Sequence, residues 1–177
     1  MAETIASESA YKGRIFDIRV DTIREGDVEY KREIVVHRGS AVIVPVFDDG
    51  TVALVRQYRH AAAKYMLELP AGSLEKGEEA RTCALREIEE EIGYKASSVE
   101  LITEFYVSPG FLTEKMYVFL ATGLTKTKQN LGIDELIEVE RMTFSKALEL
   151  IQNGAIDDAK SIIGLTTAAA RVQKPAR

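Results

Sequence analysis

The sequence predicts an α+β fold, in which a few helices pack on a mixed β-sheet. Several short segments show the period-two or valine-rich patterns that are typical of strands, whereas only three segments carry helix signals. The chain has 177 residues, of which 46% are hydrophobic and 29% are charged. This length and balance indicate one domain with a modest extension, able to bury a core without disulfides.

The sequence of the N-terminal part predicts a loose tail followed by two strands. Met1–Ala10 is polar and acidic, so we expect no regular structure there. Arg14–Ile23 alternates between apolar and charged residues, which is the period of a half-buried strand. Glu25-Gly26-Asp27 supplies a turn, and a second strand follows it through Val36.

The middle of the chain predicts the central strands. Ala41–Phe47 is rich in valine, which indicates a buried strand. Asp48-Asp49-Gly50 is a strong hairpin signal, so we expect Val52–Tyr58 to return as the partner of that strand. Further strands are expected at Val99–Val107, Lys115–Ala121 and Leu136–Phe144, with loops at Pro70–Gly77 and Thr125–Asp134.

The strongest helix prediction covers Glu78–Ile92. The segment has good helix formers, no proline, and Gly93 at its end. Its apolar residues recur near the helical period on one face, so we expect that face to pack on the sheet. Two further helices are expected, one capped by Ser145 and one opened by Asp157 or Asp158.

Charge and cysteine content exclude several classes of protein. The formal net charge of −5 argues against broad nucleic-acid binding, which needs a basic face. Cys83 is the single cysteine, which excludes an intrachain disulfide and agrees with a reducing compartment. Met1–Ala10 lacks the features of a signal peptide, and no apolar run approaches the roughly 20 residues that span a bilayer. We therefore expect a cytoplasmic protein that binds neither nucleic acid nor membrane.

Three acids of the predicted helix share one face. Glu87, Glu90 and Glu91 stand at i, i+3 and i+4. Like charges at this spacing repel by a few tenths of a kcal/mol per pair, so a cation should offset them. Mg²⁺ prefers oxygen ligands, and the bend at Pro70-Ala71-Gly72 could add a backbone carbonyl. On spacing alone, a solvated acidic helix is an equally good interpretation.

The segment Leu67–Tyr94 resembles the Nudix box, whose pattern is G-x5-E-x7-R-E-U-x-E-E-x-G-U with U aliphatic. Tyr94 departs from it at the final U, which is a packing position. The resemblance implies the Nudix fold, a mixed sheet sandwiched between helices (α/β/α). The residues in register are Gly72, Glu78, Arg86, Glu87, Ile88, Glu90, Glu91 and Gly93.

The resemblance also implies the metal chemistry. In the family, the acids that match Glu87, Glu90 and Glu91 bind metal ions, and the backbone carbonyl at the position of Ala71 helps. We therefore expect roughly two or three Mg²⁺ ions per site, with Mn²⁺ as an alternative. The catalytic set then includes these acids and Arg86. Gly72, Glu78 and Gly93 are expected to be structural, with Glu78 pairing with Arg86.

The flanking segments resemble the ADP-ribose pyrophosphatase group of the family. They are Leu54–Arg59, Leu67–Gly72, Ser108-Pro109-Gly110 and Asp134–Val139. This resemblance implies hydrolysis of ADP-ribose to AMP and ribose 5-phosphate. The alternatives are hydrolysis of GDP-mannose or another nucleotide sugar, and a Nudix domain that binds a nucleotide as a regulator without cleaving it.

The same resemblance suggests roles for single residues outside the box. Arg59, with Arg56 beside it, is expected to contact the substrate diphosphate, since a guanidinium suits phosphate oxygens. Arg32 is expected to help hold the substrate. Glu135 is the expected activator of the attacking water, with Glu138 next. The remaining expected substrate contacts are Pro109, Gly110 and Glu114.

Members of the group are homodimers that exchange their N-terminal strands. The sequence fits this scheme, because two isolated strands are marginal on their own. We therefore expect residues 1–38 to form a tail and β extension that take part in dimer exchange. Residues 39–177 would form the hydrolase domain.

Overall fold

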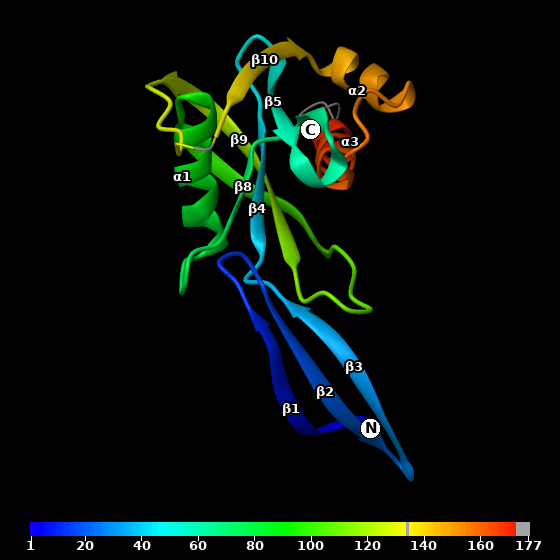
Figure 1. Cartoon of the computed structure of the whole chain (residues 1–177). Helices are drawn as coiled ribbons and strands as arrows, with labels where there is room; N and C mark the ends of the chain where they lie inside the picture. Colours follow the sequence, from blue (N-terminus) through cyan, green and yellow to red (C-terminus); the bar gives the residue numbers. More distant parts are fainter. Residues whose placement is uncertain (134, 173–177) are drawn as a thin grey trace. The chain divides into compact units, whose positions relative to one another are not determined.

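The computed structural model describes residues 1–133 and 135–172 (Figure 1). This part of the chain divides into two compact units. The first unit is Met1–Gly39 together with Phe105–Met116. The second unit is Ser40–Glu104 together with the described residues from Tyr117 onward. The predicted boundary after residue 38 lies next to the end of the N-terminal segment, but the sequence does not predict that residues 105–116 join it.

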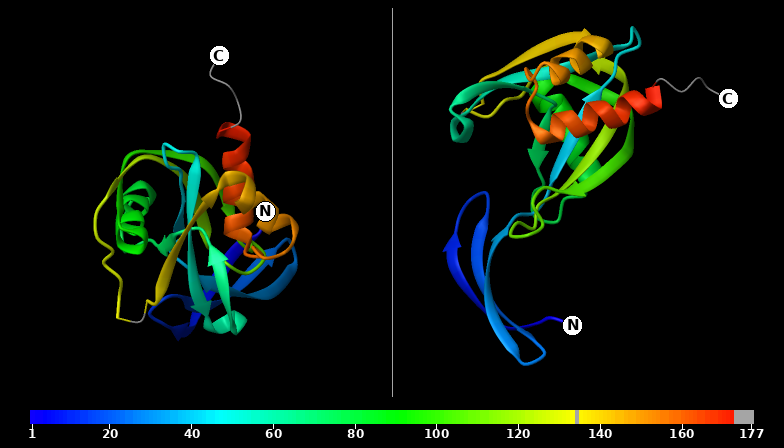
Figure 2. Two further views of the ribbon diagram at one scale, coloured as in Figure 1. Left: turned by 90° about the horizontal axis from the view of Figure 1, so that it is seen from above. Right: turned by 90° about the vertical axis from the view of Figure 1, so that its right-hand side faces the viewer.

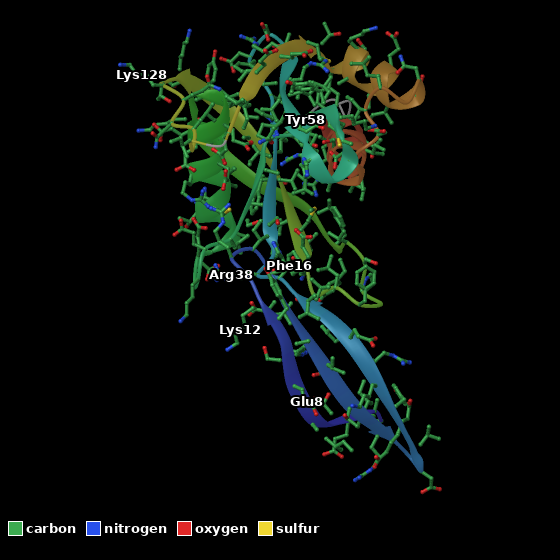
Figure 3. All side chains as sticks on the ribbon, in the orientation of Figure 1. Glu8, Lys12, Phe16, Arg38, Tyr58 and Lys128 are labelled. Carbon is green, nitrogen blue, oxygen red and sulfur yellow. The ribbon has the colours of Figure 1, made fainter. Side chains whose placement is uncertain are left out.

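Three antiparallel strands form the sheet of the first unit, in the order β1-β2-β3. They are β1 (Glu3–Lys12), β2 (Asp17–Glu25) and β3 (Val28–Val36). The expectation of a loose tail over the first ten residues is therefore wrong. Every residue of β1 is exposed, including Glu8 and Lys12 (Figure 3), so the strand needs no apolar alternation that a sequence pattern could reveal.

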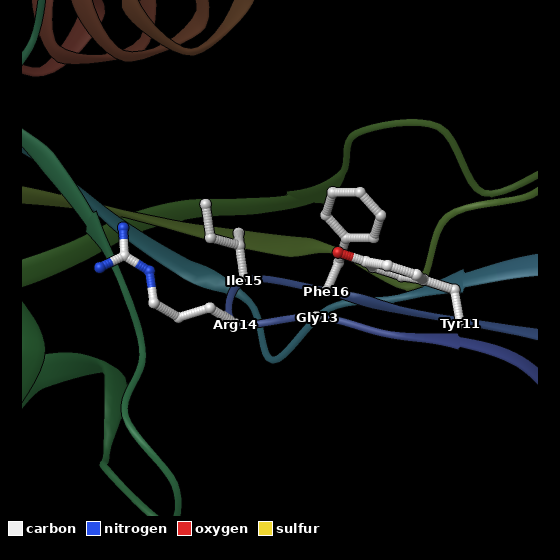
Figure 4. Close-up of a pocket in the computed structure, with 5 residues that line it drawn as sticks. All are labelled: Tyr11, Gly13, Arg14, Ile15 and Phe16. Carbon is white, nitrogen blue, oxygen red and sulfur yellow. The ribbon is translucent and has the colours of Figure 1, made fainter.

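A tight turn around Gly13 joins β1 to β2. The Gly13 N–H donates to the carbonyl oxygen of Phe16 at 3.1 Å, and the Tyr11 and Phe16 rings lie 6.0 Å apart. A Cβ on residue 13 would lie 2.7 Å from the backbone oxygen of Phe16, so this position requires glycine. Ile15 and Phe16 project to one side of the turn and the Arg14 guanidinium extends away from them (Figure 4). The turn therefore carries exposed apolar side chains.

Two sheets form the second unit. One has the order β7-β4-β9-β8, and the other has the order β10-β5-β6. The strands of the first of these sheets are β7 (Ala71–Ser73), β4 (Ser40–Pro45), β9 (Lys115–Lys126) and β8 (Tyr94–Tyr106). Those of the second are β10 (Ile137–Thr143), β5 (Thr51–Arg59) and β6 (Lys64–Glu68).

The turn at residues 48–50 is present, but its two strands are not partners. The Phe47 N–H donates to the Thr51 carbonyl at 2.9 Å, and a single bridge joins Val46 to Val52. Beyond that bridge β5 enters the other sheet, where it pairs with β10 and β6. The predicted hairpin is therefore wrong, because a turn signal fixes a chain reversal and not the later hydrogen-bond partner. The short strand β7 likewise replaces part of a predicted loop.

Helices α1 (Ala80–Ile92) and α3 (Ala159–Val172) lie on opposite sides of β4 (Figures 1 and 2). Ile43 of β4 shares a buried cluster with Ile88 of α1. Val44 points the other way, 3.4 Å from where a Cβ on Gly164 of α3 would stand. This arrangement confirms the predicted sandwich of helices around a sheet. Within the described residues, no helix is long and apolar enough to cross a membrane.

The short helix α2 (Phe144–Gln152) has a different N-cap from the predicted one. The Thr143 side chain accepts the Lys146 N–H at 3.2 Å, so Thr143 is the cap and Ser145 already lies inside the helix. For α3 the prediction of an opening aspartate is confirmed, because Asp158 accepts the Ser161 N–H at 3.1 Å.

Replacing Thr143 tests this cap. Thr143→Ala should lower the free energy of unfolding by about 1 kcal/mol, because a helix N–H loses its acceptor. Ser145→Ala is the matched control and should cost clearly less, although its hydroxyl lies 3.1 Å from that of Thr143. Urea unfolding followed by circular dichroism measures both. Equal losses in the two variants would contradict the assignment.

Candidate functional site

The acidic face of α1 is largely buried. Glu87 and Glu91 are only 8% and 5% exposed, close to the values of core residues, while Glu90 is half-buried. Cys83, one turn before Glu87, and Ile88, directly after it, are fully buried in the core. The apolar face fixes the helix against the sheet, and this anchoring holds the acids in the unit rather than in open solvent.

Glu87 lies directly on the backbone of Gly72. A Cβ at residue 72 would stand 1.7 Å from Oε1 and 2.0 Å from Cδ of Glu87, far inside van der Waals contact. Gly72 belongs to β7, which pairs with β4 at Ala41. Glycine is therefore required at the first box position because the carboxylate of the helix occupies the space of a side chain.

Glu91 contacts the same short strand. The Ala71 N–H donates to Oε2 of Glu91 at 3.0 Å. Burial, followed by the negative charge of Glu87, raises the pKa of Glu91 to about 8, although the Ala71 N–H opposes this rise. Burial also raises the pKa of Glu87. The fold thus holds two carboxyl groups where a second charge is costly unless a cation accompanies it.

Arg86 supplies positive charge on the solvent side of this face. Its Nε and Nη2 each donate to Glu78 at 3.1 Å, and its Nη1 donates to Glu87 at 2.6 Å and to Glu90 at 2.9 Å. The pairing with Arg86 lowers the pKa of Glu78, which also accepts the Glu75 N–H at 2.9 Å. Arg86 therefore ties the loop before α1 to the helix and partly neutralises two of its acids.

The donor set of this face fits a hard divalent cation. Carboxylate and carbonyl oxygens are the ligands that Mg²⁺ prefers. Because Glu87 and Glu91 are buried, a cation that offsets their negative charge is favoured. Within the described residues, no three acidic, histidine or cysteine side chains already converge around one point. Glu87 and Glu90 turn instead toward Arg86. Ligand roles for Glu87, Glu90, Glu91 and the Ala71 carbonyl remain predictions.

The segment after β9 closes the C-terminal end of α1, beside Lys128 (Figure 3). Gly93 ends the helix with φ of 71°, as predicted. The Asn130 N–H then donates to the carbonyl of Glu90 at 3.0 Å, and the Gln129 side chain donates to that of Glu91 at 2.7 Å. The sequence gives no signal for these caps, because residues 38 or more positions apart supply donor and acceptor.

Glu135 follows on the same connection. Its carboxylate accepts the Gly132 N–H at 2.8 Å, and it is half-buried. Burial is the main cause of the raised pKa of Glu91, and the negative charge of Glu135 contributes to it. The structure therefore brings Glu135 into the electrostatic range of the helix acids. Glu138 is exposed on β10, and Asp134 lies outside the described residues.

The two arginines of β5 have different partners. Arg59 ends the strand and donates to the buried Glu68. Burial raises the pKa of Glu91 and the positive charge of Arg59 opposes that rise, so Arg59 lies within reach of the acidic face. Arg56 donates instead to Glu140 on β10 at 2.5 Å. Arg59 is therefore coupled to the acidic face, whereas Arg56 is held by Glu140.

The other predicted substrate contacts belong to the first unit. Arg32 on β3 is exposed, and its guanidinium lies 4.4 Å from the centre of the Tyr30 ring. Pro109 and Gly110 form a turn closed by the Leu112 N–H, which donates to the Ser108 carbonyl at 2.9 Å. Glu114 lies 3.6 Å from Nδ1 of His37. Their roles toward a substrate remain predictions.

Comparison with known proteins identifies the family. Residues 37–163 match the NUDIX domain, so the chain belongs to the Nudix family and the resemblance of its box is confirmed. The ADP-ribose pyrophosphatase of Bacillus subtilis (strain 168) is 41% identical over 162 residues, which cover 90% of this chain and 88% of that one. The methanol dehydrogenase activator of Bacillus methanolicus is 36% identical over 92% and 90% of the two chains.

Two further likenesses bear on the substrate and the fold. The GDP-mannose pyrophosphatase of Cronobacter sakazakii (strain ATCC BAA-894) is 35% identical over 80% of each chain. A crystal structure of an ADP compounds hydrolase has a TM-score of 0.85 and covers 97% of this chain and 94% of that one. At 20% sequence identity, this likeness establishes the shared fold alone.

A methyl group at residue 72 tests the contact between the loop and the helix. Gly72→Ala should push Glu87 away and weaken Mg²⁺ binding by roughly tenfold or more, because the added methyl group displaces a side chain that is expected to be a metal ligand. Gly110→Ala is the matched control, since a Cβ there meets nothing within 4 Å. Isothermal titration with Mg²⁺ measures both affinities. Unchanged binding in Gly72→Ala would contradict the proposed packing.

Proposed function

We propose that this chain is a pyrophosphatase that hydrolyses ADP-ribose to AMP and ribose 5-phosphate. The observation that carries the proposal is the buried acidic face of α1, packed on Gly72 and coupled to Arg59. Such a face suits a substrate whose diphosphate arrives with divalent cations. The relation to an ADP-ribose pyrophosphatase over 90% of the chain supports this choice of substrate.

Glu87, Glu90, Glu91 and the Ala71 carbonyl would hold the ions, for which we propose Mg²⁺ in roughly two or three positions, with Mn²⁺ as an alternative. When bound, Mg²⁺ offsets the charge of the diphosphate and makes water a better nucleophile at neutral pH. Glu87 and Glu90 must release Arg86 in part to do so, since each now accepts from it. Arg86 would remain held by Glu78.

The remaining residues of the second unit would bind substrate and move a proton. Arg59 would donate to the phosphate oxygens, for which the guanidinium geometry is suited. Arg56, held by Glu140, would assist only if it leaves that partner. Glu135 would accept the proton of the attacking water, because it is the loop acid that acts electrostatically on Glu87 and Glu91.

The remaining expected substrate contacts are residues of the first unit. Arg32 would help to hold the substrate from the N-terminal strands. Pro109 and Gly110 would contact it from the turn after β8, and Glu114 would approach the terminal ribose. These assignments rest on the resemblance to the ADP-ribose pyrophosphatase group.

The principal rival substrate is GDP-mannose or another nucleotide sugar. A GDP-mannose pyrophosphatase is also similar to this chain, and the metal-binding acids would serve either substrate. A regulator that binds a nucleotide without cleaving it is the rival of another class. Retention of every box carboxylate favours an enzyme over such a regulator.

We also propose that the protein is a homodimer with exchanged N-terminal strands. The first unit supports this, because β1 is exposed along its whole length. Contiguous exposed apolar patches commonly mark interfaces, and the exposed side chains of Tyr11, Ile15 and Phe16 gather at the turn after β1. Ile5 and Val28 are further exposed apolar side chains of the N-terminal strands and turns. A cytoplasmic location without nucleic-acid or membrane partners remains our expectation from the sequence.

A substrate panel tests the function. With Mg²⁺, the wild type should release AMP from ADP-ribose faster than it releases GMP from GDP-mannose, and EDTA should abolish both reactions. Glu91→Gln should lower kcat by about 100-fold or more, because it removes a ligand charge from the site. Chromatography of the nucleotide products measures the rates. Near-normal turnover by Glu91→Gln would overturn the metal assignment, and binding without cleavage by the wild type would favour the regulator.

Glu135→Gln should also lose most of its activity in this assay, with unchanged Mg²⁺ affinity. Glu138→Gln is its control, because Glu138 is exposed on β10, whereas Glu135 is among the main charges that act on Glu87 and Glu91. If Glu138→Gln loses the activity instead, the base has to be reassigned.

Sedimentation velocity tests the dimer. The wild type should sediment as a dimer, and the double substitution Ile15→Asp and Phe16→Asp should shift it toward the monomer, because charges then stand where apolar side chains would be buried. Tyr58→Asp, which changes an exposed aromatic residue of the second unit, should leave the dimer intact. A monomeric wild type would refute the proposal.

A further inference from the structure

Glu68 is the most deeply buried carboxylate near the site that the proposed mechanism does not use. It ends β6 and is only 2% exposed. Arg59 Nε donates to its two oxygens at 3.0 and 3.1 Å, and Nη2 of Arg59 donates at 2.6 Å. This bidentate contact fixes the plane of the guanidinium and not merely its distance from the acid.

A second cation holds the same carboxylate. Lys160 of α3 is 9% exposed, and its Nζ donates to Oε2 of Glu68 at 2.6 Å and lies 3.1 Å from Asp158. Burial favours the neutral form of Glu68, but the hydrogen bonds from Arg59 and the charge of Lys160 outweigh it and lower the pKa of Glu68. Glu68 is therefore an ionised group between two cations.

The lysine is itself fixed by the start of α3. Asp158 accepts both the N–H and the hydroxyl of Ser161, and that hydroxyl accepts the Leu69 N–H at 2.7 Å. Leu69 directly follows Glu68 in the chain. The backbone after β6 and the first turn of α3 are thus joined twice, once through Ser161 and once through the ion pair.

This arrangement leaves Arg59 suited to a ligand. The bonds to Glu68 use Nε and Nη2, and no residue in the described part of the chain accepts a hydrogen bond from Nη1. Arg59 is also partly exposed, with 38% of its side chain accessible. Glu68 carries one negative charge and faces two cations, Arg59 and Lys160. It therefore does not fully neutralise the guanidinium of Arg59.

Stability alone is a weak explanation for such a network. Replacing a buried ion pair by apolar residues is often neutral or stabilising, because the charges must first be removed from water. Holding a functional side chain in one orientation is a use that an apolar pair could not supply.

We propose that Glu68 and Lys160 are positioning residues that orient Arg59 toward the substrate diphosphate and keep its charge available to it. This inference rests on the proposed function, in which Arg59 binds that diphosphate. Helix α3, which contributes no residue to the predicted site, would thereby act on substrate affinity through Lys160.

The first measurement is the affinity for ADP-ribose in EDTA, where no metal-dependent turnover occurs, together with KM and kcat in Mg²⁺. Glu68→Gln keeps the shape of the side chain without its charge, and Lys160→Met keeps an aliphatic chain without its ammonium group. Each should raise Kd and KM by roughly tenfold, since a charged hydrogen bond to the ligand is weakened, while kcat changes less than threefold.

Lys64→Met is the matched control. Lys64 is the cross-strand backbone partner of Arg59, and its side chain pairs with Asp157. This ion pair also joins β6 to the segment before α3, but it is exposed and does not involve Glu68. Lys64→Met should leave Kd and KM unchanged.

The second measurement separates positioning from folding. In an Arg59→Ala background, Glu68→Gln and Lys160→Met should cause no further rise in Kd or KM, because they act through the missing arginine. A merely structural role would lower the active fraction and kcat equally in both backgrounds.

The outcomes distinguish the two proposals. Unchanged Kd and KM in Glu68→Gln and Lys160→Met, beside a clear loss in Arg59→Ala, would overturn the positioning role alone. Binding of ADP-ribose by the wild type without cleavage would overturn the enzymatic function, and the Kd series would still decide the positioning role. Absence of both binding and cleavage would overturn both.

Discussion

The contact between the Glu87 carboxylate and the bare backbone of Gly72 constrains the rest of the site. It places an ionisable group where only a glycine leaves room, and it brings the helix α1 and the strand β7 to a fixed separation. The neighbouring bond from the Ala71 N–H to Glu91 holds the same two elements one residue earlier along the strand and one turn later along the helix. Both acids are consequently buried. Burial disfavours their charged forms unless a cation lies close to them.

Other parts of the second unit hold α1 in place and bring positive charge to its acids. The apolar face of α1 packs on β4 and prevents the helix from carrying its acids out to solvent. Arg86 provides charge from the exposed side, and Arg59 approaches from β5. The segment around Gln129 and Asn130 occupies carbonyls at the end of α1, and the same segment continues to Glu135. One helix therefore gathers groups from several distant parts of the chain.

The sequence predicts correctly those elements that carry a pattern of their own. It fails where the hydrogen-bonded partner of a strand has to be known. The box helix, Gly93 at its end and the buried β4 were all evident, since periodicity and glycine chemistry are local properties. The strand β1 was missed because none of its residues is buried, so nothing in its composition marks it. The hairpin partner of β4 was wrong because β5 enters a different sheet after a single bridge, a choice made by contacts with β10 and β6.

The sequence by itself determined the family, the helix acids and the glycine that faces them, because the box compresses these groups into one short stretch. It also supplied Arg59 and Glu135 as candidates, but not what holds them. Only the tertiary structure decided that Glu68 and Lys160, 92 positions apart, share one buried charge beside Arg59. It likewise decided that Arg56 pairs with Glu140 rather than with the acidic face. These ion pairs depend on which distant backbone segments pack together. The spacing of residues along the chain does not encode that packing.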